Sequence, residues 1–128
     1  MTIHHLFVYG TLRPGDVRWP MLEPFVAGDG VDDQVAGRLY DTGLDYPAAT
    51  FGATSIITGL TYPLRIDTLD RCLDVLDREE DTVLGLYRRV SVRTGRGFDA
   101  WAYAYGEGLD LTPIPSGDWF DRPSRGRR

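Results

Sequence analysis

The fold is decided by residues 67–105, DTLDRCLDVLDREEDTVLGLYRRVSVRTGRGFDAWAYAY, which predict a helix followed by a β-hairpin. In residues 67–80, apolar side chains recur at helical spacing and form a single stripe: Leu69, Cys72, Leu73 and Leu76. Asp67 is the expected N-cap, and Asp70 adds an acid in the first turn, where the helix dipole favours negative charge. We therefore expect one amphipathic helix over residues 67–80.

The second part of this stretch alternates between apolar and polar or small residues with a period of two. Residues 87–94 and 98–105 show this alternation on both sides of Gly95-Arg96-Gly97, which predicts a β-hairpin. The second strand should separate its side chains by size, with alanines on one face (Ala100, Ala102 and Ala104) and aromatic rings on the other (Trp101, Tyr103 and Tyr105).

Three further segments predict strands: residues 3–9 (IHHLFVY), 35–41 (VAGRLYD) and 54–64 (TSIITGLTYPL). Gly37 and Gly59 within them indicate bulges or close approaches of the backbone. Residues 13–25 are rich in proline and predict a loop with room for one short helical turn, and residues 42–52 predict a second loop. Strands dominate and the one helix stands between them, so we expect an α+β domain with a mixed or antiparallel sheet that can curl into a barrel.

Length and composition place the chain among compact cytoplasmic proteins. Its 128 residues suit one domain, over residues 1–122, followed by a basic and flexible tail at 123–128. The single cysteine cannot form an intramolecular disulfide, which favours a reducing compartment. The N-terminal residues do not resemble a signal peptide, and no segment approaches the ~20 apolar residues of a membrane span. We therefore expect no membrane partner.

The charge of the chain argues against several classes of function. The net charge is −5, although the last eight residues, DRPSRGRR, carry four arginines and one acid. Because an acidic surface repels phosphate backbones, we do not expect nucleic acid binding. The chain has no lysine, which excludes Schiff-base chemistry and a P-loop lysine.

The most informative side chain is that of Glu80. At 100° per residue, position 80 falls close to the centre of the apolar stripe of the helix, so a helix continued to that point would direct Glu80 towards the core. A carboxylate that is partly desolvated there would have a raised pKa, as a general acid/base near neutral pH requires. The alternative is that residues 77–81, DREED, form a polar helix end in which Glu80 pairs with Arg88 or Arg89.

A second candidate is FVYGTLRPG, residues 7–15, in which a strand runs into a tight turn at Gly10. Successive backbone N–H groups in such a turn can converge on an anion, although an ordinary β-turn has the same pattern. Other candidates are weaker. His4 and His5 are adjacent in a strand and should point to opposite faces, and Cys72 belongs to the apolar stripe. No zinc spacing or cofactor motif is present, so we expect no metal and no cofactor.

Several segments resemble the γ-glutamylcyclotransferase-like proteins, a family that includes the AIG2-like proteins. They occur in the order typical of the family and span nearly the whole chain: FVYGTLRPG (7–15), LDREED (76–81), LYRRVSV (86–92), AWAYAY (100–105) and SGDWFDRP (116–123). The resemblance implies a small mixed β-barrel flanked by a few helices. It also implies an enzyme that releases 5-oxoproline from a small γ-glutamyl amine or peptide, without a cofactor.

The same resemblance assigns the site residues. The glutamate of the family falls on Glu80, which would be the general acid/base, and Tyr87 would line the substrate pocket or donate a hydrogen bond. The loop that binds the substrate falls on Tyr9, Gly10, Thr11 and Leu12. Asp81 stands where the family has glycine and Glu79 where it has an apolar residue, so Glu79 is the second candidate for the acid/base. A non-catalytic module that binds a small ligand or a partner in the same cavity is the alternative function.

Overall fold

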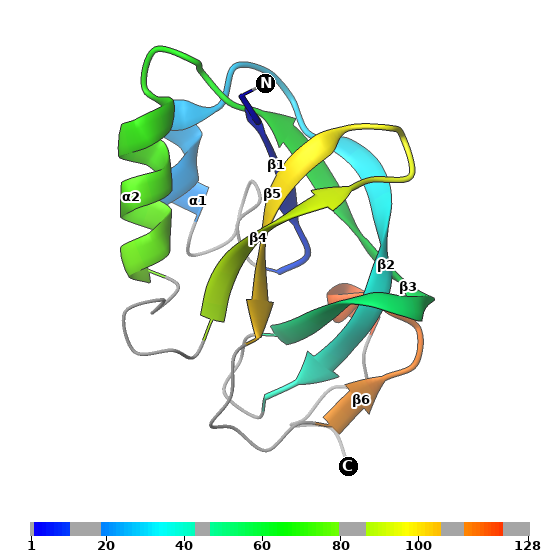
Figure 1. Cartoon of the computed structure of the whole chain (residues 1–128). Helices are drawn as coiled ribbons and strands as arrows, with labels where there is room; N and C mark the ends of the chain where they lie inside the picture. The colour runs from blue at the N-terminus through cyan, green and yellow to red at the C-terminus, as the bar shows by residue number, and fades with distance from the viewer. Residues whose placement is uncertain (1, 11–18, 43–46, 80–86, 106–111, 122–128) are drawn as a thin grey trace.

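The computed structural model describes residues 2–10, 19–42, 47–79, 87–105 and 112–121 (Figure 1). The tail predicted at 123–128 lies outside the described residues. The elements follow one another along the chain as β1 (His5–Val8), α1 (Trp19–Leu22), η1 (Glu23–Phe25), β2 (Val31–Asp41), β3 (Pro47–Pro63), α2 (Leu69–Glu79), β4 (Tyr87–Arg93), β5 (Asp99–Tyr105), β6 (Thr112–Ile114) and η3 (Trp119–Asp121). Within these ranges, no helix has the length and apolar character needed to cross a membrane.

The six strands form one mixed sheet in the order β4-β5-β1-β3-β2-β6. β1 pairs with β5 in parallel, with Leu6 opposite Trp101, and the other neighbouring strands pair antiparallel. The sheet curls into a nearly closed barrel, and α1 and α2 lie side by side along one side of it (Figure 1). The expected α+β fold, a small mixed β-barrel with flanking helices, is therefore confirmed.

The predicted hairpin is confirmed, and its turn explains Gly97. The Thr94 N–H donates to the carbonyl of Phe98, and the Gly97 N–H donates to the carbonyl of Thr94. Gly97 has a φ of 92°, a conformation that only glycine adopts without strain. The turn therefore requires glycine at this position.

β2, which begins at Val31, and β3 are both longer than the sequence predicts. β3 begins at Pro47, so residues 47–52, which composition predicts as a loop, are strand. The reason is tertiary pairing: the second half of β2, residues 37–41, pairs with residues 47–51 after a shift in register between Ala36 and Gly37. The bulge expected at Gly37 is therefore confirmed. At Gly59, a β-carbon would press against the carbonyl of Val8, so the expected close approach of the backbone is confirmed as well.

The predicted start of the helix is wrong by two residues. α2 begins at Leu69, and the carbonyl of Thr68 accepts the hydrogen bond of the Cys72 N–H. Thr68 therefore occupies the N-cap position that we expected for Asp67, because Asp67 and Thr68 form a turn before the helix. The apolar stripe is confirmed, since Leu69, Cys72 and Leu76 are buried and pack towards the sheet.

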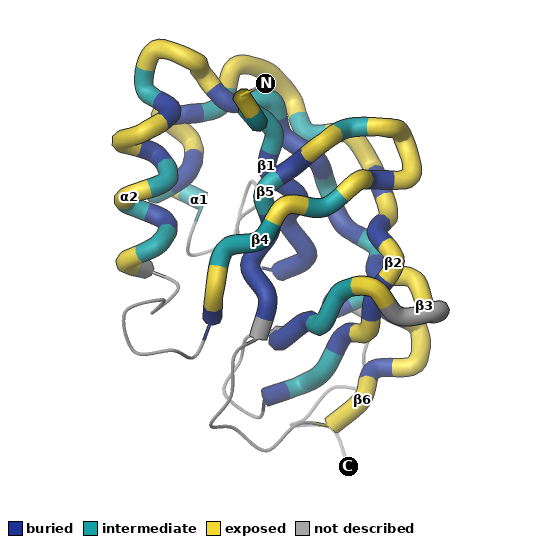
Figure 2. The backbone as a smooth tube through the Cα atoms, in the orientation of Figure 1, coloured by how far each residue is buried: buried dark blue, intermediate teal, exposed yellow. Residues whose placement is uncertain are grey.

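Alternation along the strands produces one core on each side of the sheet. One core lies between the helices and the sheet and includes Leu6, Val8 and Tyr103. The other fills the barrel and includes Phe7, Tyr9, Ala100 and Ala102. Ala100, Ala102 and Ala104 are buried, and Trp101 and Tyr103 take the helix side, as the period of two predicts. Figure 2 shows the resulting burial along β1 and β5, which lie between the two cores.

Candidate functional site

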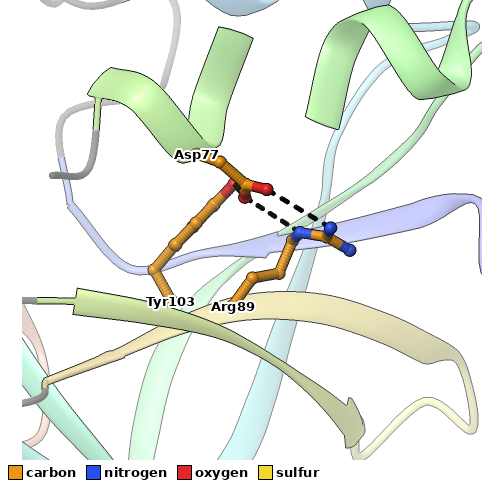
Figure 3. Close-up of polar contacts among 3 residues, drawn as sticks. All are labelled: Asp77, Arg89 and Tyr103. Carbon is orange, nitrogen blue, oxygen red and sulfur yellow. Dashed lines mark hydrogen bonds and ion pairs between the residues drawn. The ribbon is translucent and has the colours of Figure 1, made fainter. Parts of the chain in front are cut away.

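The predicted site segments meet at one end of three neighbouring strands. The chain leaves β1 at Tyr9 and Gly10, beside the carboxyl end of the parallel strand β5. Tyr87 begins β4 at this same end, where it pairs with Tyr105, the last residue of β5. The last turn of α2 contacts β4 and β5 through Asp77, so the helix also ends here (Figure 3).

Tyr9 and Gly10 lie at the start of the predicted substrate loop, and both are buried. The Tyr9 hydroxyl donates a hydrogen bond to the backbone carbonyl of Tyr103, and its ring meets Phe51 edge to face at 6.2 Å between centroids. This contact fixes the chain as it leaves β1. Thr11 and Leu12 lie outside the described residues, so the anion-binding turn stays a prediction.

Tyr87 is 4% exposed and lies at this end of the sheet. It is held by pairing with Tyr105 at the open end of the hairpin. A buried tyrosine offers a flat apolar face together with one hydroxyl, which suits the wall of a small pocket. Its role towards a substrate stays a prediction.

Glu80, the predicted acid/base, lies outside the described residues, and the side chain of Glu79 is not described. The helix that leads to them is described as far as Glu79, and Leu76 in its last turn is fully buried. The described part of the apolar stripe therefore faces the core, as the prediction for Glu80 requires. The position of the Glu80 carboxylate stays a prediction.

Arg89, one of the two arginines proposed as alternative partners of Glu80, binds a different acid. Arg89 Nε lies 2.9 Å from Asp77 Oδ1, and Arg89 Nη2 lies 3.3 Å from Asp77 Oδ2. The guanidinium therefore donates a hydrogen bond to each carboxylate oxygen (Figure 3). The Tyr103 hydroxyl donates to the same Oδ1 at 2.6 Å. The Arg89 guanidinium also lies 4.3 Å from the centroid of the Trp101 ring.

Sequence reasoning missed Asp77, although a signal was present. Position 77 lies on the flank of the apolar stripe, next to Leu76, and not opposite it. An acid on the flank of a buried face is expected to seek a partner on the element that the helix covers. Arg89 on the hairpin supplies that partner.

A second acid that sequence reasoning missed is Asp33 on β2, at the opposite end of the hairpin. Its side chain is buried and accepts hydrogen bonds from the N–H groups of Gln34 (2.8 Å) and Arg96 (3.1 Å) and from the Thr61 hydroxyl (2.8 Å). Burial acts to raise the pKa of Asp33, but hydrogen bonds from Thr94, Gln34, Thr61 and Arg96 together lower it below its ordinary value. A carboxylate of this kind is a weak base, so we assign it to the fold and not to acid/base chemistry.

Asp33 borders an open pocket of about 370 Å³ lined by Asp32, Asp33, Gln34, Thr58, Gly95 and Arg96. This pocket lies at the turn end of the hairpin, whereas Tyr9 and Tyr87 lie at its open end. The pocket is therefore separate from the end of the sheet where the predicted site segments meet.

The remaining candidates give one confirmation and one correction. Cys72 is fully buried, and burial raises the pKa of its thiol to about 11, so it is a core residue. The prediction that His4 and His5 point to opposite faces is wrong, because their ring centroids lie 4.6 Å apart. His4 precedes β1, so strand alternation does not apply to the pair. The described part of the chain contains no group of three or more potential metal ligands.

Comparison with known proteins agrees with this architecture. The family described as "Gamma-glutamyl cyclotransferase, AIG2-like" matches residues 6–121. A Vibrio cholerae protein named "Putative gamma-glutamylcyclotransferase" is 37% identical over 120 residues, which are 93% of this chain and 97% of that protein. The solution structure of the protein ytfP from Escherichia coli is 33% identical, with a TM-score of 0.54 over 92% of this chain and 97% of its own.

A more distant likeness supports the fold alone. An AIG2-like protein from Mus musculus superimposes with a TM-score of 0.62 at 18% identity, and all of both chains is covered. The family match spans most of the chain and contains the described strands and helices except His5, the first residue of β1. The chain therefore belongs to the AIG2-like gamma-glutamyl cyclotransferase family.

Proposed function

We propose that this protein is a cyclotransferase that releases 5-oxoproline from a small γ-glutamyl amine or peptide, with Glu80 as its general acid/base. Membership of the family supports this class of reaction. The observation that carries the proposal is the meeting of β1, β4, β5 and α2 at one end of the sheet. The predicted loop and the predicted acid/base each follow directly in sequence from an element that ends there.

The reaction would be an intramolecular acyl transfer. The α-amine of the γ-glutamyl group attacks its own side-chain carbonyl, the new C–N bond closes the five-membered ring, and the original amide bond breaks. Glu80 would take a proton from the α-ammonium group and return one to the departing amine. Because the nucleophile belongs to the substrate, the enzyme only has to fold the substrate into the cyclic geometry and move the proton.

The other predicted residues would hold the substrate in that geometry. Backbone N–H groups of residues 9–12 would bind the substrate carboxylate or the oxyanion that forms during attack. The buried ring of Tyr87 would form the pocket wall and exclude water from the reacting amine. The Tyr9 hydroxyl is already bound to the carbonyl of Tyr103, so Tyr9 would anchor the loop and not contact the substrate with its hydroxyl.

The test is to measure 5-oxoproline formation from a panel of γ-glutamyl compounds that differ in the leaving amine. Glu80→Gln keeps the size of the side chain but cannot accept the proton, so turnover should fall ~10²- to 10⁴-fold while the melting temperature is kept. Glu79→Gln is the matched control, because it makes the same change one position earlier and should keep turnover near that of the wild type.

Three results would change the assignment. Loss of turnover in Glu79→Gln, with Glu80→Gln active, would transfer the role to Glu79. A lower melting temperature with turnover kept in Glu80→Gln would make Glu80 a structural partner of Arg88 or Arg89. Absence of turnover in the wild type across the panel would favour a module that binds small ligands on the same fold.

A further inference from the structure

We propose that Asp77 is a positioning residue of this enzyme: through Arg89 and Tyr103 it holds the last turn of α2 against the hairpin and so sets the direction in which Glu80 points. This inference rests on the proposed function, because it assumes that Glu80 handles the proton. It assigns a role to a side chain that would not itself contact the substrate.

The first step of the argument is the geometry of the contact between the helix and the hairpin. Arg89 binds both oxygens of Asp77, at 2.9 and 3.3 Å, and the flat guanidinium defines the plane of the carboxylate. The Arg89 guanidinium lies over the Trp101 ring, 4.3 Å from the centroid of that ring. A two-point contact between two planar groups fixes the rotation of the helix end as well as its distance from the hairpin.

The second step is that Tyr103 connects this contact to the predicted substrate loop. Its hydroxyl donates to Asp77 at 2.6 Å, and its backbone carbonyl accepts the hydrogen bond of the Tyr9 hydroxyl. A single residue of β5 therefore links the end of α2 with the end of β1. The two elements from which the predicted loop and acid/base follow are held to the same point of the sheet.

The third step is the place of Asp77 in the helix. An acid in the last turn of a helix interacts unfavourably with the negative end of the helix dipole, so Asp77 is a poor choice for helix stability alone. It lies three residues before Glu80, and each helical residue turns the chain by about 100°. A small rotation of this last turn would therefore change the direction in which the chain leaves the helix.

The fourth step is a comparison with the two other ion pairs in the described part of the chain. Asp74 pairs with Arg78 within α2, at side-chain exposures of 61% and 76%. Arg93 pairs with Asp99 within the hairpin, at 69% and 46%. The Asp77–Arg89 pair is 30% and 25% exposed and joins the helix to the sheet. Neither of the other two pairs joins a helix to the sheet.

The test compares steady-state kinetics of the wild type, Asp77→Asn and the matched control Asp74→Asn. Both changes remove one acid from α2, but only the first breaks the contact with the hairpin. We expect kcat of Asp77→Asn to fall about 10- to 100-fold, the effect of a misplacement of about 1 Å, with KM within about threefold of the wild type. The pH profile of kcat should keep its shape, since Asp77 does not exchange the substrate proton.

A double variant shows whether Asp77 acts through its partner. If the two side chains act as one unit, the double variant of Asp77→Asn and Arg89→Leu should have a kcat no lower than that of the more impaired single variant. Should Asp77→Asn fail to fold, Tyr103→Phe decides the question, because it removes one hydrogen bond and keeps the ring in the core. A folded Tyr103→Phe with lowered kcat supports the inference.

The results that overturn this inference differ from those that overturn the proposed function. An inactive wild type removes the proposed function, and the positioning role with it, before any variant is compared. An active wild type in which Asp77→Asn behaves like Asp74→Asn overturns the positioning role alone. The same conclusion follows if Asp77→Asn or Tyr103→Phe changes only KM, or if the two losses in the double variant multiply.

Discussion

The two ends of the β4–β5 hairpin are each held by one aspartate, and the two aspartates bind different kinds of partner. At the turn end, Asp33 accepts hydrogen bonds from neutral donors, two backbone N–H groups and the Thr61 hydroxyl. At the open end, Asp77 binds the charged guanidinium of Arg89 and the hydroxyl of Tyr103. One acid is 5% exposed, and the side chain of the other is 30% exposed.

This difference separates a contact that holds the fold from one that can adjust a site. Asp33 binds donors from both β2 and the hairpin turn, and the loss of its carboxylate would leave the buried Thr61 hydroxyl and two partly buried N–H groups without a strong acceptor. Asp77 is partly open to water, so water can replace some of its contacts. We therefore expect Asp33 to matter more for stability and Asp77 more for turnover.

The largest expected effect on stability separates the two ends directly. Asp33→Ala should lower the free energy of unfolding by about 3 kcal/mol, because it removes a charged acceptor from one buried hydroxyl and two partly buried N–H groups at once. Asp77→Ala should lower it by only about 1 kcal/mol, because both partners are partly solvated. Urea unfolding measures both, and Asp32→Ala, at the exposed neighbouring position, is the matched control.

The opposite order of the two losses in stability would contradict the comparison between Asp33 and Asp77. If Asp77→Ala were the more destabilising change, its contact would be a structural link and its effect on turnover would follow from partial unfolding. Turnover per folded molecule should stay near the wild-type value in Asp33→Ala. A large loss there would connect the turn end of the hairpin to the site.

The helix and the hairpin could be predicted from the sequence because their signals are local. The stripe that begins at Leu69 and the alternation of residues 98–105 each lie within one element, and the structure confirms both. The first half of β3 could not be predicted in this way. Its loop-like composition is overridden by pairing with β2 across the bulge at Gly37.

The partners of the two aspartates could not be predicted because they are distant in the sequence. Asp33 binds the N–H of Arg96, 63 residues further along the chain, and Asp77 binds Tyr103, 26 residues further along. Only the fold brings these groups together, and a single sequence contains no record of such contacts. The resemblance to the family predicts Glu80 and residues 9–12 as site residues, but it gives no information on what holds these segments in place.

The next largest expected effect is on stability at acid pH, and it tests the role of Asp33. Its pKa is lowered in the folded protein, so its contribution to stability is present above the unfolded pKa of about 3.9 and is lost as pH falls through the folded pKa. Stability of the wild type should therefore fall more steeply below pH 4 than that of Asp33→Asn. The difference in slope is at most about 1.4 kcal/mol per pH unit, the value for one proton.

Urea unfolding at a series of pH values from 2 to 6 measures this difference. Asp77→Asn supplies the comparison from the open end of the hairpin. Parallel curves for the wild type and Asp33→Asn would show that the hydrogen bonds of Asp33 do not favour its ionised form. The turn end would then be held by packing, and the contrast between the two acids would disappear.

The smallest expected effect comes from an exposed ion pair beside the turn of the hairpin. Arg93 and Asp99 face each other on β4 and β5 at 2.8 Å, yet their side chains are 69% and 46% exposed. Pairs of this kind contribute roughly 0–0.5 kcal/mol and weaken further in salt, so Asp99→Asn should leave urea unfolding and turnover nearly unchanged. The hairpin thus carries an exposed ion pair at its turn end and a partly buried ion pair at its open end. If Asp99→Asn cost as much as Asp77→Ala, charge alone would account for the open end, and the planar contact between Asp77 and Arg89 would have no special role. A negligible cost of Asp99→Asn, with a lowered kcat in Asp77→Asn, would attribute the effect to the connection between helix and sheet.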